Sequence, residues 1–205
     1  MFTEPLLHPL RFCSNLCATL RTVALTLFDA PNETRAPTQT TNTADPIQGE
    51  SSMTDICTKF LFRLTLQVGA HHVVGATPFG NRRVAPIAGG TFEGPELAGT
   101  VLPGGTDWIT EDAAGAWFRI NVQVPLRTHD GELLTMAYQG FRSGPPEVLA
   151  KVSRGEPVDA DSYYYRVSGS FETASARLAR LNTLVAVAKG WRTSVGPGYD
   201  VFEVL

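Results

Sequence analysis

From Phe60 onward, the sequence is divided into short segments in which apolar and polar residues alternate, separated by turns rich in glycine or proline. In the segment 60–68, for example, every second residue from Phe60 to Val68 is a large apolar one. A period of two residues is typical of β-strands that bury one face, and it does not suit a helix. This part of the chain therefore has to fold as β-sheet with one face turned towards a core.

The same pattern predicts strands along the rest of the chain. Beyond 60–68, we expect strands at 84–92, 97–102, 117–126, 133–141, 163–167, 170–173, 181–188 and 200–204. The pair Gly89 and Gly90 interrupts one of them, which predicts a bulge, a sharp bend or a close approach of two backbones. The sequence His129-Asp130-Gly131 supplies the turn chemistry of a β-hairpin between two long segments.

One short helix is expected between Pro145 and Gly155. Proline is tolerated in the first turn of a helix, Glu147 suits the positive end of the helix dipole, and glycine is a natural stop. Many short strands and one helix indicate an all-β domain, either a sandwich or a closed barrel. Closure removes unpaired strand edges, which favours a single antiparallel β-barrel.

The N-terminal quarter of the chain has a different composition. Residues 30–52 are rich in threonine, proline, asparagine and serine, and they cannot bury enough apolar area to offset the entropy of ordering. Residues 1–28 contain Arg11 and Arg21, one acid at Glu4 and scattered leucine and phenylalanine, which mildly resembles a transit peptide.

We therefore expect residues 1–52 to be a disordered or targeting-like extension and residues 53–205 to be the barrel domain. An alternative is that translation starts at Met53 and that the extension is not made. Three cysteines, Cys13, Cys17 and Cys57, do not describe a disulfide framework and fit a reducing compartment. A cytoplasmic location is expected, and the extension leaves organelle targeting open.

Charge and hydropathy restrict the partners. The net charge is −3 for the whole chain, and the sequence contains no basic stripe, so no nucleic acid is expected. No run approaches the length of about 18 apolar residues that a membrane span needs. The cysteine pair Cys13 and Cys17 lacks a second Cys/His pair, and His71 and His72 are adjacent rather than spaced for one face, so no metal site is predicted.

Several motifs carry a resemblance to a known family. They are Gly89–Pro95, Gly99–Trp108, Thr128–Gly131, Gly144–Val148, Tyr163–Arg166, Phe171–Thr173 and Leu181–Asn182. Their order and spacing over about residues 58–205 resemble the bacterial and fungal domain-of-unknown-function family 3237. The resemblance implies a small β-barrel, calycin-like or allene-oxide-cyclase-like, and no settled activity. The chain departs from the family pattern at Gln123, where arginine is common, and at Arg180, where an aromatic residue is common.

Barrels of this size can hold one small ligand, so polar side chains among the apolar strands are the candidates for a site. Glu93 ends a strand, and its carboxylate either acts as a general acid or base in a pocket or caps a turn. Asp107 follows a glycine-rich turn. It is either a second acid beside the aromatic wall of Trp108 or part of an Asx turn with Trp108 packed in the core.

Arg166 and Glu172 lie on two successive predicted strands, where they could form an interior ion pair. Such a pair either binds the carboxylate or enolate oxygens of a ligand or only satisfies a buried charge. The predicted catalytic residues are therefore Glu93, Asp107, Arg166 and Glu172.

Four further residues are predicted to bind the substrate. Trp108 and Tyr164 would supply aromatic surface, and Tyr164 is expected to share its face with Arg166. Tyr138 either donates a hydrogen bond to a ligand oxygen or packs in the core. Asn182, in a predicted apolar strand, either binds the ligand or ties two strands together.

The motifs of several enzyme classes are missing from the sequence. It contains no G-x-S-x-G nucleophile elbow and no glycine-rich loop followed by a helix and lysine, so neither that hydrolase chemistry nor nucleotide binding is expected. The first hypothesis is a cofactor-independent isomerase, cyclase or lyase acting on a small hydrophobic metabolite of secondary metabolism. The alternatives are a non-catalytic small-molecule-binding barrel and a structural module with a filled core. The sequence does not set the oligomeric state and is compatible with a homo-oligomer.

Overall fold

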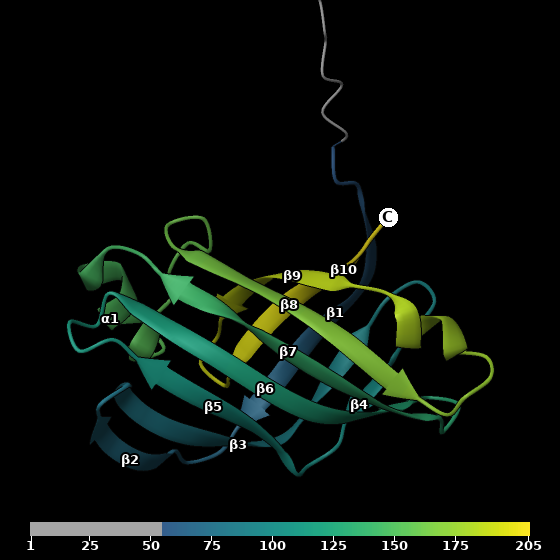
Figure 1. Cartoon of the computed structure of the whole chain (residues 1–205), viewed down its shortest axis with the longest axis horizontal. Coiled ribbons are helices and arrows are strands. Elements are labelled where there is room, and N and C mark those ends of the chain that lie inside the picture. The colour runs from purple at the N-terminus through teal and green to yellow at the C-terminus, as the bar shows by residue number, and fades with distance from the viewer. Residues whose placement is uncertain (1–54) are drawn as a thin grey trace, which may run out of the picture. The chain divides into compact units, whose positions relative to one another are not determined.

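Residues 55–205 form an antiparallel β-barrel with one α-helix and one short 3₁₀ helix, as described by a computed structural model (Figure 1). The strands are β1 Thr58–Val68, β2 His72–Thr77, β3 Gly80–Glu93, β4 Gly99–Val101, β5 Gly105–Glu111, β6 Trp117–Thr128, β7 Leu133–Ser143, β8 Tyr164–Thr173, β9 Ala186–Arg192 and β10 Pro197–Val204. The helices are α1 Pro146–Ser153 and η1 Ala179–Thr183. The expectations for residues 1–52 and for Met53 lie outside the described residues.

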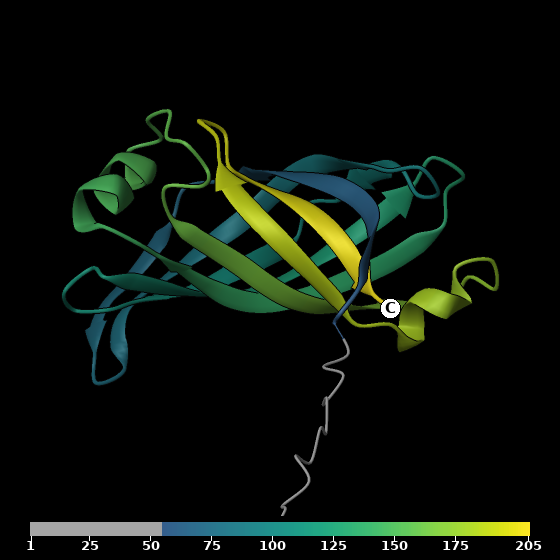
Figure 2. The ribbon, with the colours of Figure 1, turned by 90° about the horizontal axis from the view of Figure 1, so that it is seen from above.

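The barrel closes because β1 pairs on both of its sides. It is antiparallel to β10 along one edge and to the second half of β3 along the other. From β10 the pairing continues through β9, β8, β7 and β6, and the short strands β4 and β5 both bridge β6 to β3. Figure 2 shows β1 lying beside β10, so the first and last strands meet. The predicted closed, all-β barrel is confirmed.

The paired glycines in β3 mark a bulge and a close approach of two backbones, as predicted. The pairing of β1 with β3 shifts register between Gln67 and Val68, opposite Gly89. Gly90 has a φ of 149°, and a Cβ atom at this position would lie 2.0 Å from the carbonyl oxygen of Thr65. Only glycine fits there, and the local bend helps the sheet to curve onto itself.

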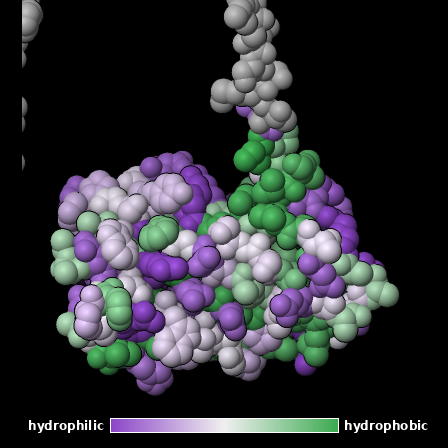
Figure 3. Space-filling view, in the orientation of Figure 1, coloured by the Kyte–Doolittle hydropathy of each residue, from purple (hydrophilic) through white to green (hydrophobic). Residues whose placement is uncertain are grey.

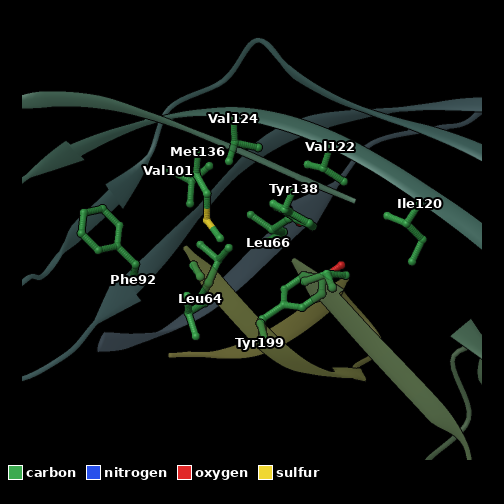
Figure 4. Packing of buried hydrophobic residues seen from close by; sticks show 14 of the residues in the cluster. Leu64, Leu66, Phe92, Val101, Ile120, Val122, Val124, Met136, Tyr138 and Tyr199 are labelled. Atoms are coloured by element: carbon green, nitrogen blue, oxygen red, sulfur yellow. The ribbon is translucent and has the colours of Figure 1, made fainter. Parts of the chain in front are cut away.

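One half of the barrel interior is filled with apolar side chains. Phe62 lies at its centre, in edge-to-face contact with Phe92 and Phe171 at ring-centroid distances of 5.5 Å and 5.9 Å. Leu64 and Met136 are also fully buried and, in Figure 4, point into the barrel from β1 and β7. Alternation within each strand places these residues inside, as the period of two predicted.

Several boundaries differ from the prediction. The segments 163–167 and 170–173 are one continuous strand, β8, because Gly169 sits within the ladder and does not end it. The expected strand 181–188 begins as the helix η1 and becomes strand only at Ala186. Strand β2 was not predicted, since His72–Thr77 is largely exposed and lacks alternation of apolar residues.

Strand β5 was also missed, because its one buried carboxylate breaks the apolar period. The short helix from Pro146 was predicted correctly, and Gly155 follows it with a φ of 74°. Among the helices of residues 55–205, none is long and apolar enough to cross a membrane.

Candidate functional site

The second half of the barrel interior contains a cavity of about 260 Å³. Side chains from β1, β3 and all strands from β5 to β10 line it, and Ser153 at the end of α1 lies beside it. Its apolar wall consists of Leu66, Val68, Ala85, Ile87, Ile109, Phe118, Ile120 and Pro197. Its polar lining consists of His71, Arg83, Asp107, Glu111, Arg142, Ser153, Tyr165 and Arg192. Charged groups and apolar surface thus share one enclosed space.

Asp107 is the buried carboxylate of this cavity. It lies on β5, where alternation turns it into the barrel and leaves its side chain 8% exposed. One carboxylate oxygen accepts a hydrogen bond from the backbone N–H of Asn121 at 3.3 Å. Burial raises the pKa of Asp107 from its ordinary value of 3.8 to about 7, although the hydrogen bond and the nearby Arg142 act in the opposite direction. Near neutral pH, the carboxyl group can therefore both accept and release a proton.

Arg142 is the buried cation of the cavity. Its side chain is 7% exposed, and its guanidinium carbon lies 4.2 Å from the centre of the Phe118 ring. Its Nε has no hydrogen-bond partner among residues 55–205. Burial lowers the pKa of Arg142, and the positive charges of Arg192 and Arg83 lower it further.

Arg83 also lies near this aromatic ring. Its guanidinium carbon is 5.4 Å from the centre of the Phe118 ring, and its Nη1 donates to Glu111 Oε2 at 2.6 Å. Arg192 and His71 complete the basic lining. Burial is the main cause that lowers the pKa of His71, with Arg83 and Arg192 adding to it. The cavity thus gathers more basic than acidic groups.

Three tyrosines form a cluster between the cavity and the apolar half. The hydroxyl groups of Tyr165 and Tyr199 are hydrogen-bonded at 2.5 Å, and their rings meet edge to face with centroids 5.3 Å apart. The ring of Tyr138 packs on Tyr199 at 5.1 Å. Burial raises the pKa of Tyr165 to about 12, so its hydroxyl keeps its proton and can donate it in a hydrogen bond. Only Tyr165 of the three lines the cavity.

Two of the predicted site residues, Asp107 and Tyr138, lie inside the barrel. The alternative of an Asx turn at Asp107 was wrong, because the residue lies within a strand. Trp108 does not pack in the core, since the next position of the strand faces outwards and leaves it 48% exposed. Tyr138 is buried in the core cluster, and its hydroxyl has no hydrogen-bond partner within the described part of the chain.

The other predicted catalytic residues lie on the outside of the barrel. Glu93 is exposed at the end of β3, and Glu172 is exposed on β8. Arg166 and Glu172 share one strand, with neighbours Tyr165 and Phe171 facing inwards, so the expected interior ion pair between them is not formed. The structure therefore does not gather the four predicted catalytic residues around one cavity.

Arg166 and Tyr164 share a face, as predicted, but that face is the outer one. The guanidinium of Arg166 lies 5.4 Å from the centre of the Tyr164 ring, and its Nη1 donates to the carbonyl oxygen of Tyr165 at 3.0 Å. Both line an open external groove of about 640 Å³ over strands β6 to β10. Figure 3 shows the molecule from the side of β6 to β9, and this face is a patchwork of hydrophilic and hydrophobic residues. An open groove with solvated charges is less suited to shifting a proton than the enclosed cavity.

Asn182 lies in η1 rather than in a strand. Its Oδ1 accepts from the backbone N–H of Thr173 at 2.8 Å, and its Nδ2 donates to the carbonyl oxygen of Thr173 at 3.0 Å. The side chain thus ties the 3₁₀ helix to the end of β8. The two departures from the family pattern also lie outside the cavity, with Gln123 exposed on β6 and Arg180 paired with Glu203.

The sequence prediction missed most of the cavity's polar lining. Arg142 could have been found, because it continues the alternation of Leu134, Met136 and Tyr138, although it lies one residue beyond the predicted end of that strand. Tyr165 could have been found by the same count along β8. Arg83 and Arg192 continue the alternation of Ala85 and Ile87 and of Ala186 and Ala188 beyond the predicted ends of their strands, whereas His71 lies before β2, outside any strand, and carries no such signal.

Comparisons with known proteins agree on a family and give no activity for it. The family described as "Protein of unknown function (DUF3237)" matches residues 56–204. A protein named "UPF0311 protein" from Bradyrhizobium diazoefficiens is 33% identical over 148 residues, which cover 72% of this chain and 96% of the relative. The crystal structure of a conserved protein of unknown function from Rhodopseudomonas palustris has a TM-score of 0.69 and 31% identity, covering 74% of this chain and 99% of that one.

A more distant structure shares the fold. It is described as an enzyme from Penicillium herquei, and it has a TM-score of 0.57 with 20% identity over 74% of this chain and 96% of that one. At this identity, the likeness concerns the arrangement of the strands alone.

Proposed function

The chain belongs to the DUF3237 family, whose description states no activity, and from its cavity we propose that it is a cofactor-independent enzyme that moves a proton on a small metabolite. The reaction class is that of an isomerase, cyclase or lyase. The observation that carries the proposal is the meeting of a buried carboxylate, Asp107, with the hydroxyl of Tyr165 and the guanidinium of Arg142 in one enclosed cavity.

Each of these groups can take one role in a proton transfer. Asp107, with a pKa of about 7, takes a proton from a carbon or hydroxyl group of the substrate. The charge that develops on a substrate oxygen is stabilised by hydrogen bonds from Tyr165 and Arg142, which are held in place before the reaction starts. The protonated carboxyl group then returns the proton to another position of the same molecule, so that no other reactant is needed.

The cavity's dimensions and walls support a compact and partly apolar substrate. Its volume of about 260 Å³ lies just below the usual range for ligand pockets, which begins at about 300 Å³. The aliphatic residues from β1, β3, β5 and β6 would cover the apolar body of the substrate. Enclosure by these residues also keeps the electrostatic interactions of the reacting group strong.

The second candidate is a barrel that binds a small molecule without changing it. The enclosed cavity supports this function as well. A carrier, however, has no need of a carboxyl group that titrates near neutral pH and is held away from any ion pair. The position of Asp107 therefore favours the enzyme.

Proton exchange with the solvent tests the proposal without knowledge of the natural substrate. In D₂O, the full chain is expected to speed the exchange of the C–H protons next to the carbonyl group of phenylpyruvate above the rate in buffer, as followed by NMR. Asp107→Asn should reduce this rate at least about a hundredfold, the lower end of the usual contribution of a general base. Glu172→Gln, on the outside of the barrel, is the matched control and should leave it unchanged. Exchange no faster than buffer, or equal rates for the wild type and Asp107→Asn, would count against the proposal.

A further inference from the structure

We infer that the ligand of the cavity is a small organic anion whose carboxylate or enolate oxygens are bound by the guanidinium of Arg142. The inference rests on the proposed function for the location of the site, and it adds the chemical class of the substrate. Anion binding can be measured in the absence of any turnover, so the two can be tested apart.

The first argument is that Arg142 is buried without a counter-ion of its own. Within residues 55–205, no ion pair and no side-chain hydrogen bond involves it, and its Nε is unpartnered. An arginine that is 7% exposed would ordinarily be paired, because an uncompensated buried charge costs several kcal/mol. Phe118 covers one face of the guanidinium, which leaves its N–H groups, at the edge of the plane, for a ligand.

The second argument concerns the balance of charge around the cavity. Its lining contains three guanidinium groups, those of Arg83, Arg142 and Arg192, and only two carboxylates, those of Asp107 and Glu111. Glu111 is already engaged by Arg83 at 2.6 Å. The remaining cations repel each other in a space of low dielectric constant, and an anion placed between them would relieve this repulsion.

Asp107 does not serve as the permanent partner of Arg142. The structure contains no hydrogen bond between them, and the carboxylate of Asp107 is bonded instead to the backbone of Asn121. The attraction of Arg142 lowers the pKa of Asp107 by less than burial raises it, so the two do not form a settled ion pair. Asp107 is therefore available as a base and Arg142 as an anion-binding group, and both can act on one ligand.

The geometry of the guanidinium group restricts the chemical class of the anion further. A guanidinium group presents N–H donors in a planar fork, which matches the two oxygens of a carboxylate or of an enolised keto acid. The apolar wall and the volume of about 260 Å³ leave room for one compact hydrocarbon group attached to it. The preferred ligand is thus a small aryl or branched-chain carboxylate, and the neutral amide of the same shape should be rejected.

Benzoate and benzamide test this distinction, because they have nearly the same shape and differ in charge. Calorimetric titration of the full chain should show benzoate binding at least about tenfold more tightly than benzamide. Arg142→Gln should weaken benzoate binding at least tenfold, whereas Arg119→Gln, on the outer face, should not change it. Asp107→Asn should retain benzoate binding while losing proton exchange, because it removes the base and keeps the arginine.

A second measurement follows ligand binding in the wild-type protein and uses a variant only to assign one resonance. In wild-type protein with ¹⁵N-labelled arginine, benzoate should shift the Nε resonance that is missing from the spectrum of Arg142→Lys, and benzamide should not. Equal affinity for benzoate and benzamide, or no shift of that resonance on addition of benzoate, would overturn the inference. Loss of phenylpyruvate exchange in Asp107→Asn together with such a result would retain the proposed function and reject only the binding of the ligand's carboxylate or enolate oxygens by Arg142.

Discussion

Phe118 and Arg142 are direct cross-strand partners on β6 and β7, and the guanidinium of Arg142 lies over the aromatic ring at 4.2 Å. The register of the two strands therefore fixes the position of the cation in the cavity. Because β6 and β7 pair along their whole length, from Trp117 with Ser143 to Arg127 with Leu133, this position is held by one of the longest ladders of the barrel.

Replacing the ring should therefore affect both stability and ligand binding. Phe118→Leu removes the cation–π contact and part of the buried ring, and it is expected to lower the free energy of unfolding by about 1–3 kcal/mol. It should also weaken benzoate binding, because Arg142 loses its support. The control is Phe171→Leu in the filled half of the barrel, which should be destabilising without a change in affinity. Urea denaturation and calorimetry measure the two effects, and equal loss of affinity in both variants would contradict the prediction.

The stability of the protein should depend on pH through Asp107. The folded-state pKa of Asp107 is about 7, whereas its ordinary value is 3.8, so the folded state holds a proton that the unfolded chain has already lost. The contribution of Asp107 to stability is therefore fully present below pH 3.8 and is lost as the pH rises through 7. The loss amounts to roughly 4 kcal/mol, from 1.36 kcal/mol per pKa unit.

Asp107→Asn, which is neutral at every pH, should remove this dependence. Relative to the wild type, the variant should gain stability between pH 5.5 and pH 8.5, as measured by urea unfolding at both values. Glu172→Gln is the control for a general effect of removing an acid and should show no such gain. A stability difference between Asp107→Asn and the wild type that is the same at both pH values would mean that Asp107 titrates as an ordinary carboxylate.

Asn182 should contribute to stability and not to ligand binding. Asn182→Ala removes two hydrogen bonds to the backbone of Thr173, and we expect a loss of about 1–2 kcal/mol in the free energy of unfolding. Benzoate affinity should stay unchanged, because Asn182 does not line the cavity. Asn121→Ala, whose exposed side chain makes none of the described hydrogen bonds, is the control. Weaker benzoate binding by Asn182→Ala than by this control would mean that Asn182 contributes to ligand binding.

Gly90→Ala should be a strongly destabilising small substitution. The added Cβ would lie 2.0 Å from the carbonyl oxygen of Thr65, which belongs to the strand that closes the barrel, and the φ of 149° adds strain. We expect a loss of at least about 3 kcal/mol. Gly131→Ala has a positive φ of 89° but open space around it, and it should cost only about 1–2 kcal/mol. Thermal denaturation of both variants tests this ranking of stability. A lower melting temperature for Gly131→Ala than for Gly90→Ala would contradict it.

The sequence predicted the fold well because burial of one face leaves a regular trace. The alternation in 60–68 and 117–126 marks strands that line the packed interior, and paired glycines mark the point where β3 and β1 approach. The strand β5 left no such trace, because its inward position is occupied by the polar Asp107 and its outward position by Trp108. The pattern breaks at the place where the barrel holds its carboxylate.

The site was predicted only in part, for the same reason. Residue type alone predicted Asp107, Glu93, Arg166 and Glu172 as catalytic. Asp107 lies in the cavity, but the other three lie outside it. Which face a polar residue takes depends on strand boundaries and bulges, and an error of one position reverses it. Arg142 was missed because its strand was ended one residue too early.

The packing around Phe62 and the charges around Arg142 occupy opposite halves of one barrel. The residues that pack around Phe62 are therefore distinct from the charged residues that would bind a ligand, and Phe118 contributes to both stability and the site. Substitutions of the polar residues that line the cavity can therefore change which ligand is bound while the packing around Phe62 is kept. Proteins with this fold could then differ in their reactions without a change of the barrel.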